Sequence, residues 1–241
     1  MTEGRTCPLA YRYRPEDLCA EPETLDADVI YVIGGLYGNP HALDEIERMA
    51  LAEERLQGTA AVHPDIQARL DALPRYRCLL FGGLKVLVLH GDPESLAGWG
   101  LAYEAFAEGN ESELNGWFGR SGADVIACTH TCLPVLWSDE IDGRQRIVAN
   151  NGSAGMGNLK SDPRGLITRI ALGDYHDSSL AGLENHGVSV SLRPVGFDLE
   201  AWLADFDQLW PAGSAAAESY RNRLVSGTSL QAGDLVFPRH T

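Results

Sequence analysis

The sequence predicts an α/β protein in which several buried strands end in polar turns. Short runs rich in Val, Ile and Leu stop at polar or glycine-containing turns, as at residues 28–33, 84–89 and 123–127. Segments with apolar residues at helical spacing accompany them, as at 40–50 and 199–209. Buried strands that alternate with helices are typical of α/β folds, and such sheets bind ligands where their strands end.

The first strand runs into a glycine-rich turn and then into a helix. Asp28 to Ile33 precede the turn Gly34-Gly35-Leu36-Tyr37-Gly38-Asn39. Asn39 followed by Pro40 predicts a helix N-cap with proline at the first helical position, where its missing N–H costs nothing. A strand that reaches a helix N-terminus through a glycine turn is a natural anion site. Alternatively, this glycine-rich turn only connects the strand to the helix and binds no ligand.

Three later strands also end in turns whose side chains suit ligand binding. These turns are His90-Gly91-Asp92-Pro93, Cys128-Thr129-His130-Thr131-Cys132 and Asn150-Asn151-Gly152-Ser153. Parallel strands bring their ends to one edge of a sheet. We therefore expect these turns to lie near the turn after the first strand.

Together the turns resemble those of the calcineurin-like metallophosphoesterase family, especially its small bacterial members. In that family the first strand ends in Asp-x-His-Gly-Asn, a later strand in His-Gly, another in Gly-His-x-His, and an Asn-x-Gly-Ser turn follows. The residues that match, in the same order and within about residues 28–172, are Gly38-Asn39, His90-Gly91, His130 and Asn151-Gly152-Ser153. The resemblance implies a four-layer α/β/β/α sandwich that hydrolyses phosphoric esters at a divalent metal centre.

The chain departs from the family at three positions that would serve one of two metals, so it resembles a divergent member with degenerate metal-binding motifs. Gly35 and Tyr37 stand where the family has the Asp and His of its first motif. Cys132 stands where the family has its last His. A two-metal phosphoesterase holds phosphate between its cations and activates a bound water. Neither Gly nor a neutral Tyr replaces the lost donors.

The two middle motifs of the family, Gly-Asp-x-x-Asp and Gly-Asn-His-Asp/Glu, are not recognisable between Met49 and Cys78. The segment from Gly58 to Asp65 is a poor candidate. Either the chain lacks a βα unit that would complete the site, or an internal segment is missing from the sequence between about Arg55 and Pro64.

The resemblance implies a set of site residues. The expected metal ligands are His90, His130 and Cys132, the expected catalytic residues are His90, His130 and Asn39, and the expected phosphate or substrate contacts are Gly35, Tyr37, Gly38, Asn39 and Asn151. The divalent metal would be Mn, Fe or Zn, as one ion rather than two, with a metal-free site as the alternative. Against these roles, a strand-end histidine can be merely hydrogen-bonded, and Cys132 and Tyr37 can be packing residues.

The remaining segments suggest three regions: an N-terminal arm (1–27), the metallophosphoesterase-like core (28–196) and a C-terminal helical extension packed on the core (197–241). Within them, we expect a helix at 95–107 and a late edge strand at 188–192. The extension should contain helices at 199–209 and 215–224, the second with Ser214 as its N-cap.

Composition narrows the class of protein and its partners. At 241 residues with 44% hydrophobic content, the chain can bury one full core. A net charge of −15 opposes binding to nucleic acid and to anionic membranes, and no apolar run reaches transmembrane length. Five cysteines without a signal peptide suggest reduced thiols in the cytoplasm.

The sequence thus predicts a phosphoric ester hydrolase with an altered or incomplete metal centre, acting on a phosphorylated small molecule. The alternative is a catalytically inactive module on the same scaffold that binds a phosphate ligand or a protein. The pattern specifies neither the ester class nor the oligomeric state.

Overall fold

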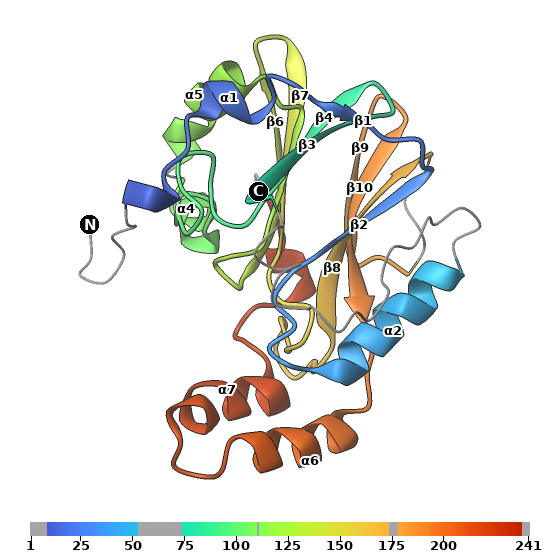
Figure 1. Cartoon of the computed structure of the whole chain (residues 1–241), viewed down its shortest axis with the longest axis vertical. Helices are drawn as coiled ribbons and strands as arrows, with labels where there is room; N and C mark the ends of the chain where they lie inside the picture. Colours follow the sequence, from blue (N-terminus) through green and yellow to red (C-terminus); the bar gives the residue numbers. More distant parts are fainter. Residues whose placement is uncertain (1–8, 53–73, 110, 174–177, 238–241) are drawn as a thin grey trace.

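The α/β prediction is confirmed by the computed structural model, which describes residues 9–52, 74–109, 111–173 and 178–237. Two β-sheets face each other and helices cover their outer faces (Figure 1). The strands are β1 (Glu23–Thr24), β2 (Val29–Ile33), β3 (Tyr76–Phe81), β4 (Leu84–Leu89), β5 (Val125–Cys128), β6 (Pro134–Ile141), β7 (Arg144–Asn151), β8 (Gly165–Leu172), β9 (Ala181–Asn185), β10 (Val188–Val195) and β11 (Val236–Phe237). The α-helices are α1 (Pro15–Leu18), α2 (Pro40–Leu51), α4 (Tyr103–Ala107), α5 (Leu114–Ser121), α6 (Leu199–Leu209) and α7 (Ala215–Ser226), and short 3₁₀ turns occur at Leu9–Tyr11, Glu111–Glu113 and Ala232–Asp234.

The larger sheet has the strand order β1-β3-β4-β5-β7-β6-β11. Its centre, β4-β5-β7, is parallel, whereas β3 and β6 run antiparallel to their inner neighbours. The parallel strands deliver the turns after residues 89, 128 and 151 to one end of the sheet. The sequence predicts a turn at Asn150 and Asn151, but these residues form the end of β7. They do so because β6 pairs with β7 through them.

The smaller sheet is antiparallel throughout, in the order β2-β8-β10-β9. The prediction of an edge strand at 188–192 is wrong, because β10 lies inside this sheet and pairs with both β8 and β9. Its alternating Ser residues are therefore buried: the Ser189 hydroxyl donates to the Ala171 carbonyl at 3.3 Å.

Three apolar clusters fill the spaces between the two sheets and between the sheets and the helices that cover them. One lies between the sheets and includes Leu79, Val86, Ile147, Val190 and Leu192. A second packs α1, α4 and α5 on the outer face of the larger sheet, and a third packs α2 on the outer face of the smaller sheet. Burial of these faces is the main stabilising term of such a sandwich.

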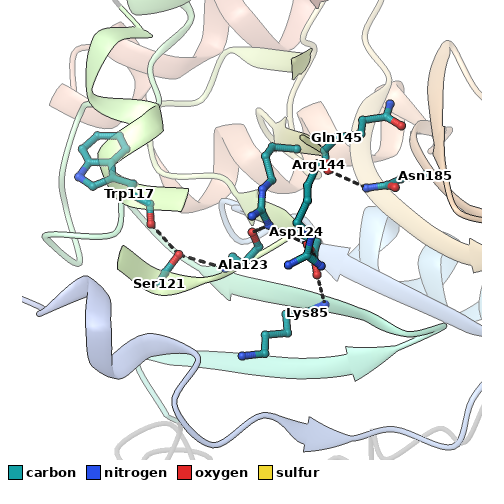
Figure 2. A network of polar contacts seen from close by, with 9 residues as sticks. Lys85, Trp117, Ser121, Ala123, Asp124, Arg144, Gln145 and Asn185 are labelled. Atoms are coloured by element: carbon teal, nitrogen blue, oxygen red, sulfur yellow. Dashed lines mark hydrogen bonds and ion pairs between the residues drawn. The ribbon is translucent and has the colours of Figure 1, made fainter. Parts of the chain in front are cut away.

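Asp124 organises the end of the larger sheet that lies opposite the strand-end turns (Figure 2). Its buried carboxylate accepts hydrogen bonds from the Lys85 backbone N–H at 2.9 Å and from the Arg146 guanidinium at 2.7 Å. Arg144, which is more exposed, forms an ion pair with the same carboxylate at 2.8 Å. The buried charge of Arg146 is thereby compensated, as buried charges must be.

The helices agree in part with the sequence-based expectations. Helix α2 begins after Asn39 and α7 begins after Ser214, as expected. The predicted helix at 95–107 is wrong in its first half, since only α4 (Tyr103–Ala107) is helical. The longest described helices have 12 residues, so none of the described helices reaches the length that crossing a bilayer needs.

Candidate functional site

The turns after β2, β4, β5 and β7 meet at one end of the two sheets. The backbone N–H of His130 donates to the His90 carbonyl at 2.9 Å, which joins the turns after β5 and β4. The Gly35 carbonyl accepts hydrogen bonds from the backbone N–H groups of Ala154 and Gly155, each at 3.1 Å. The structure thus brings together the turns that the sequence predicts to lie near one another.

Tyr37 and Cys132 contact each other across this junction. The Tyr37 Oη and Cys132 Sγ atoms are 2.6 Å apart, and the Cys132 thiol donates to the His130 carbonyl at 3.3 Å, so the hydroxyl donates to the sulfur. Burial, reinforced by the contact with Cys132, raises the pKa of the Tyr37 hydroxyl. Both residues have left-handed backbone conformations, with φ of 55° and 60°. The phenol of this pair is therefore protonated at neutral pH.

The Tyr37 ring occupies the space into which a side chain at position 35 would project. A Cβ atom built on Gly35 lies 2.6 Å from Tyr37 Cε2, closer than real Cβ contacts allow. The far side of the ring packs against Tyr220 of α7, with the ring centroids 5.3 Å apart. A carboxylate at position 35 therefore has no room while Tyr37 keeps this orientation.

His90 and His130 form the second contact of the site. His130 Nδ1 lies 2.9 Å from His90 Nε2, and Trp99 packs edge-on against the His130 ring with centroids 5.3 Å apart. Enclosure by the protein lowers the pKa of both imidazoles, and the proximity of His130 lowers the pKa of His90 further. Both rings are therefore neutral at pH 7, with one nitrogen donating its proton to the other.

Asn39 and Asn151 use their side-chain amides within the fold. Asn39 caps α2 by accepting from the Ala42 N–H at 3.1 Å, and it donates to the Gly155 carbonyl at 3.1 Å while only 1% exposed. Asn151 is fully buried and donates to the Val32 carbonyl at 2.8 Å. Both amides tie the first turn to its neighbours, and Asn151 Oδ1 accepts no hydrogen bond from the described residues.

Asp92 shapes the loop that follows β4. Its Oδ1 accepts from the backbone N–H groups of Glu94 and Ser95 at 3.0 and 2.9 Å, and its Oδ2 accepts from Gly100 at 3.1 Å. Burial raises the pKa of this carboxyl against the effect of those donors. The side chain faces its own loop and organises the segment that carries Trp99.

Arg223 of α7 reaches the same site, although nothing in the sequence singles it out. Its Nε donates to the Gly157 carbonyl at 3.1 Å and its Nη2 donates to the Cys132 carbonyl. Nη2 also lies 3.5 Å from Asn158 Oδ1. Burial lowers the pKa of this guanidinium, while Cys132 and Tyr37 act in the opposite direction. We call Tyr37, His90, His130, Cys132 and Arg223 the strand-end site.

Helices α6 and α7 cover the first turn and so bring Arg223 into place. Trp202, Phe206 and Leu224 form a buried cluster with Met156, against which Tyr37 packs. In Figure 1 these two helices form the hairpin beneath the end of the sheets.

The described residues do not fit a two-metal centre. No group of three or more His, Cys, Asp or Glu side chains in the described ranges could hold a metal ion. Position 35 is filled by the Tyr37 ring, and the Cys132 sulfur already accepts from a phenol. The segment from Gly58 to Asp65, the candidate for a middle motif, lies outside the described residues.

A single ion is compatible with the remaining histidine pair. Binding of an ion by both nitrogens would require the hydrogen bond between them to break, because each nitrogen must present a lone pair to the ion. His90 and His130 would hold that ion through Nε2 and Nδ1. Two imidazoles alone form a weak site compared with the three or four protein ligands usual for zinc.

The similarity of this chain to known proteins lies in its three-dimensional structure. No protein-family model matches the chain, and no curated protein sequence does. Among solved structures, a metallophosphoesterase from Sphaerobacter thermophilus superposes with a TM-score of 0.52 at 15% identity, covering 83% of this chain and all of that chain.

Two further structures show weaker similarity. A predicted phosphoesterase from Streptococcus pneumoniae TIGR4 gives a TM-score of 0.40 at 14% identity, covering 72% of this chain and 93% of its own. Vps29 from Chaetomium thermophilum gives 0.35 at 15% identity, covering 70% and 98%. The facing sheets, the strand-end turns and the first of these similarities together establish that this chain has the metallophosphoesterase fold.

Proposed function

We propose that this chain binds a phosphorylated small molecule at the strand-end site and does not carry out two-metal hydrolysis. The observation that supports this most directly is the Tyr37 ring, which fills the space of a side chain at position 35 and donates its hydroxyl to Cys132. Two-metal hydrolysis needs anionic ligands that hold both cations about a bridging phosphate. A glycine, a neutral phenol and a hydrogen-bonded thiol do not provide them.

The site nevertheless offers groups that suit a phosphate. The N-terminus of α2 follows the turn that carries Tyr37, and helix N-termini attract anions. The neutral pair of His90 and His130 offers imidazole N–H donors at the same end of the sheets. A divalent ion held by these two histidines would supply positive charge to a phosphate oxygen when bound.

A second candidate function, hydrolysis with one metal ion, is favoured by the proximity of His90 and His130, the two imidazoles that would hold the ion. The ion would be Mn, Fe or Zn, all of which imidazole nitrogens can bind, and it would supply positive charge at a phosphate oxygen. In this case the substrate would be a phosphoric ester, and His90 and His130 would be required for turnover.

One set of measurements separates the two functions. Purified protein is analysed for bound metals, then assayed with Mn²⁺ against p-nitrophenyl phosphate and bis(p-nitrophenyl) phosphate. His90→Ala and His130→Ala are compared with His41→Ala, an α2 histidine that pairs with Asp205. Turnover that both site variants lose and His41→Ala keeps would establish the one-metal hydrolase and contradict the binding role.

Phosphate binding has its own readout. The proposed function predicts that inorganic phosphate raises the melting temperature in the absence of turnover, because a ligand that binds only the folded state stabilises it. Sulfate and chloride at equal ionic strength serve as controls. A protein with neither turnover nor a phosphate-specific shift would refute both functions.

A further inference from the structure

We infer that Arg223 is the anion-binding residue of the strand-end site, where its guanidinium binds the phosphate group of the ligand. The inference rests on the proposed function and deepens it. It assigns the recognition of phosphate to a side chain of α7, in a part of the chain that the sequence motifs do not reach.

The first argument is the missing counter-charge. Within the described part of the chain, the guanidinium hydrogen-bonds to neutral oxygens, those of Gly157, Cys132 and Asn158. No carboxylate of the described residues lies within 4.0 Å of Arg223, although the chain carries 34 Asp and Glu residues against 19 Lys and Arg. Burial of a charge without a partner is unfavourable.

Two other arginines of the described residues are paired with carboxylates. Arg221, two residues earlier on α7, binds the Asp207 carboxylate through two hydrogen bonds of 2.8 and 2.9 Å. Arg146, which is buried, binds Asp124 at 2.7 Å. Arg223 differs from these two arginines because it lies part-buried among neutral groups. Such an environment is suited to an external anion.

The second argument is the geometry of the guanidinium. Its Nε and Nη2 are fixed by the carbonyls of Gly157 and Cys132, so the plane of the group is set before any ligand binds. Its Nη1 donates no hydrogen bond to the residues that the structure describes. A planar guanidinium with an unused nitrogen can bind phosphate through directed, charge-assisted hydrogen bonds.

The third argument is position. The Cys132 carbonyl accepts from Arg223, and the Cys132 sulfur accepts from Tyr37. Tyr37 and Cys132 are two of the residues that stand at expected metal-ligand positions. A guanidinium that lies against them places a positive charge at a part of the site where the described residues form no group of three or more metal-ligating side chains.

The test is titration of the whole protein with inorganic phosphate by isothermal calorimetry in the presence of EDTA. Arg223→Met is compared with Arg221→Met, which removes the same charge from an exposed position of the same helix. We expect Arg223→Met to weaken phosphate binding at least about tenfold and Arg221→Met to change it less than about twofold. Arg223→Lys should fall between the two, because it keeps the charge and loses the planar fork.

Equal phosphate affinity in Arg223→Met and Arg221→Met would overturn this inference and leave the proposed function standing. Failure of the wild-type protein to bind phosphate would overturn both. A purely structural Arg223 would lower the melting temperature of Arg223→Met without changing its phosphate affinity.

If Arg223→Met does not fold, the wild-type protein still gives an answer. The side-chain Nε–H resonance of Arg223 is assigned by its absence in Arg223→Lys and followed by ¹⁵N NMR during the phosphate titration. A saturable shift of this resonance, with the Arg221 resonance unchanged, supports the inference. An Arg223 resonance that does not respond while phosphate binds refutes it.

Discussion

Adding a single methyl group at Gly35 tests whether Tyr37 blocks the position of the expected metal-binding carboxylate. In Gly35→Ala, the new Cβ would lie 2.6 Å from Tyr37 Cε2 and 3.2 Å from Cζ. Gly35 is not among the glycines with positive φ, so its backbone conformation suits alanine. The cost of the substitution is therefore the steric collision with the ring.

The Tyr37 ring has little freedom to move away from that methyl group. Its hydroxyl is bound to Cys132 and its other side packs against Tyr220. Overpacking of this kind costs about 1–3 kcal/mol, and we expect Gly35→Ala to lower the free energy of unfolding by about 2 kcal/mol. In a Tyr37→Ala background the collision disappears, and we expect the cost to fall to roughly zero, since alanine also restricts the unfolded chain.

The assay is urea denaturation of the four proteins of this double-mutant cycle, followed by tryptophan fluorescence. The expected coupling energy is about 2 kcal/mol. Gly34→Ala is the matched control, because its Cβ would meet Thr129 and Asn151 instead of Tyr37. Its cost should be the same in both backgrounds. A Gly35→Ala cost that is also independent of Tyr37 would refute the steric argument.

Three further predictions follow from the polar contacts. Asp124→Asn should lower the free energy of unfolding by about 3–5 kcal/mol in denaturant titrations, because it leaves the buried Arg146 charge uncompensated; a loss under about 1 kcal/mol would contradict this. Folding lowers the pKa of His90 and His130 below the ordinary 6.5, so the unfolded chain binds more protons, and stability measured in EDTA should decrease as the pH falls below about 6.5. His130→Gln should make that decrease less steep. Asn39→Ala should cost about 1–2 kcal/mol by thermal unfolding, because the α2 cap is lost, and an unchanged melting temperature would exclude that role.

Sequence reasoning succeeded where neighbouring residues decide the structure. Asn39-Pro40 places the start of α2, and Ser214 places the start of α7, because a capping side chain and its N–H partner lie three residues apart. The same reasoning located the turns that carry His90 and His130. Local hydrogen bonding and burial settle these features.

Sequence reasoning failed where distant residues decide. Residues 95–102 have apolar spacing, yet the Asp92 carboxylate binds the N–H groups of Ser95 and Gly100 and holds this stretch as a loop. β10 is interior because β9 pairs with its second side, which its alternation could not indicate. The sequence around Arg223 is that of an ordinary surface position on a helix. Only the packing of α7 shows that its guanidinium reaches the carbonyls of Gly157 and Cys132.

The steric contact between position 35 and the Tyr37 ring also links two of the positions at which this chain differs from the family motif. A carboxylate at position 35 collides with the tyrosine ring, so Gly35→Asp alone cannot restore the first ligand. Replacing Tyr37 alone opens the space but leaves a glycine there and removes the hydrogen bond to Cys132. A side chain at position 35 is thus tolerated only when Tyr37 is replaced as well. Gly35 and Tyr37 thus form one packed arrangement with Tyr220, and a carboxylate at position 35 requires both Gly35 and Tyr37 to change.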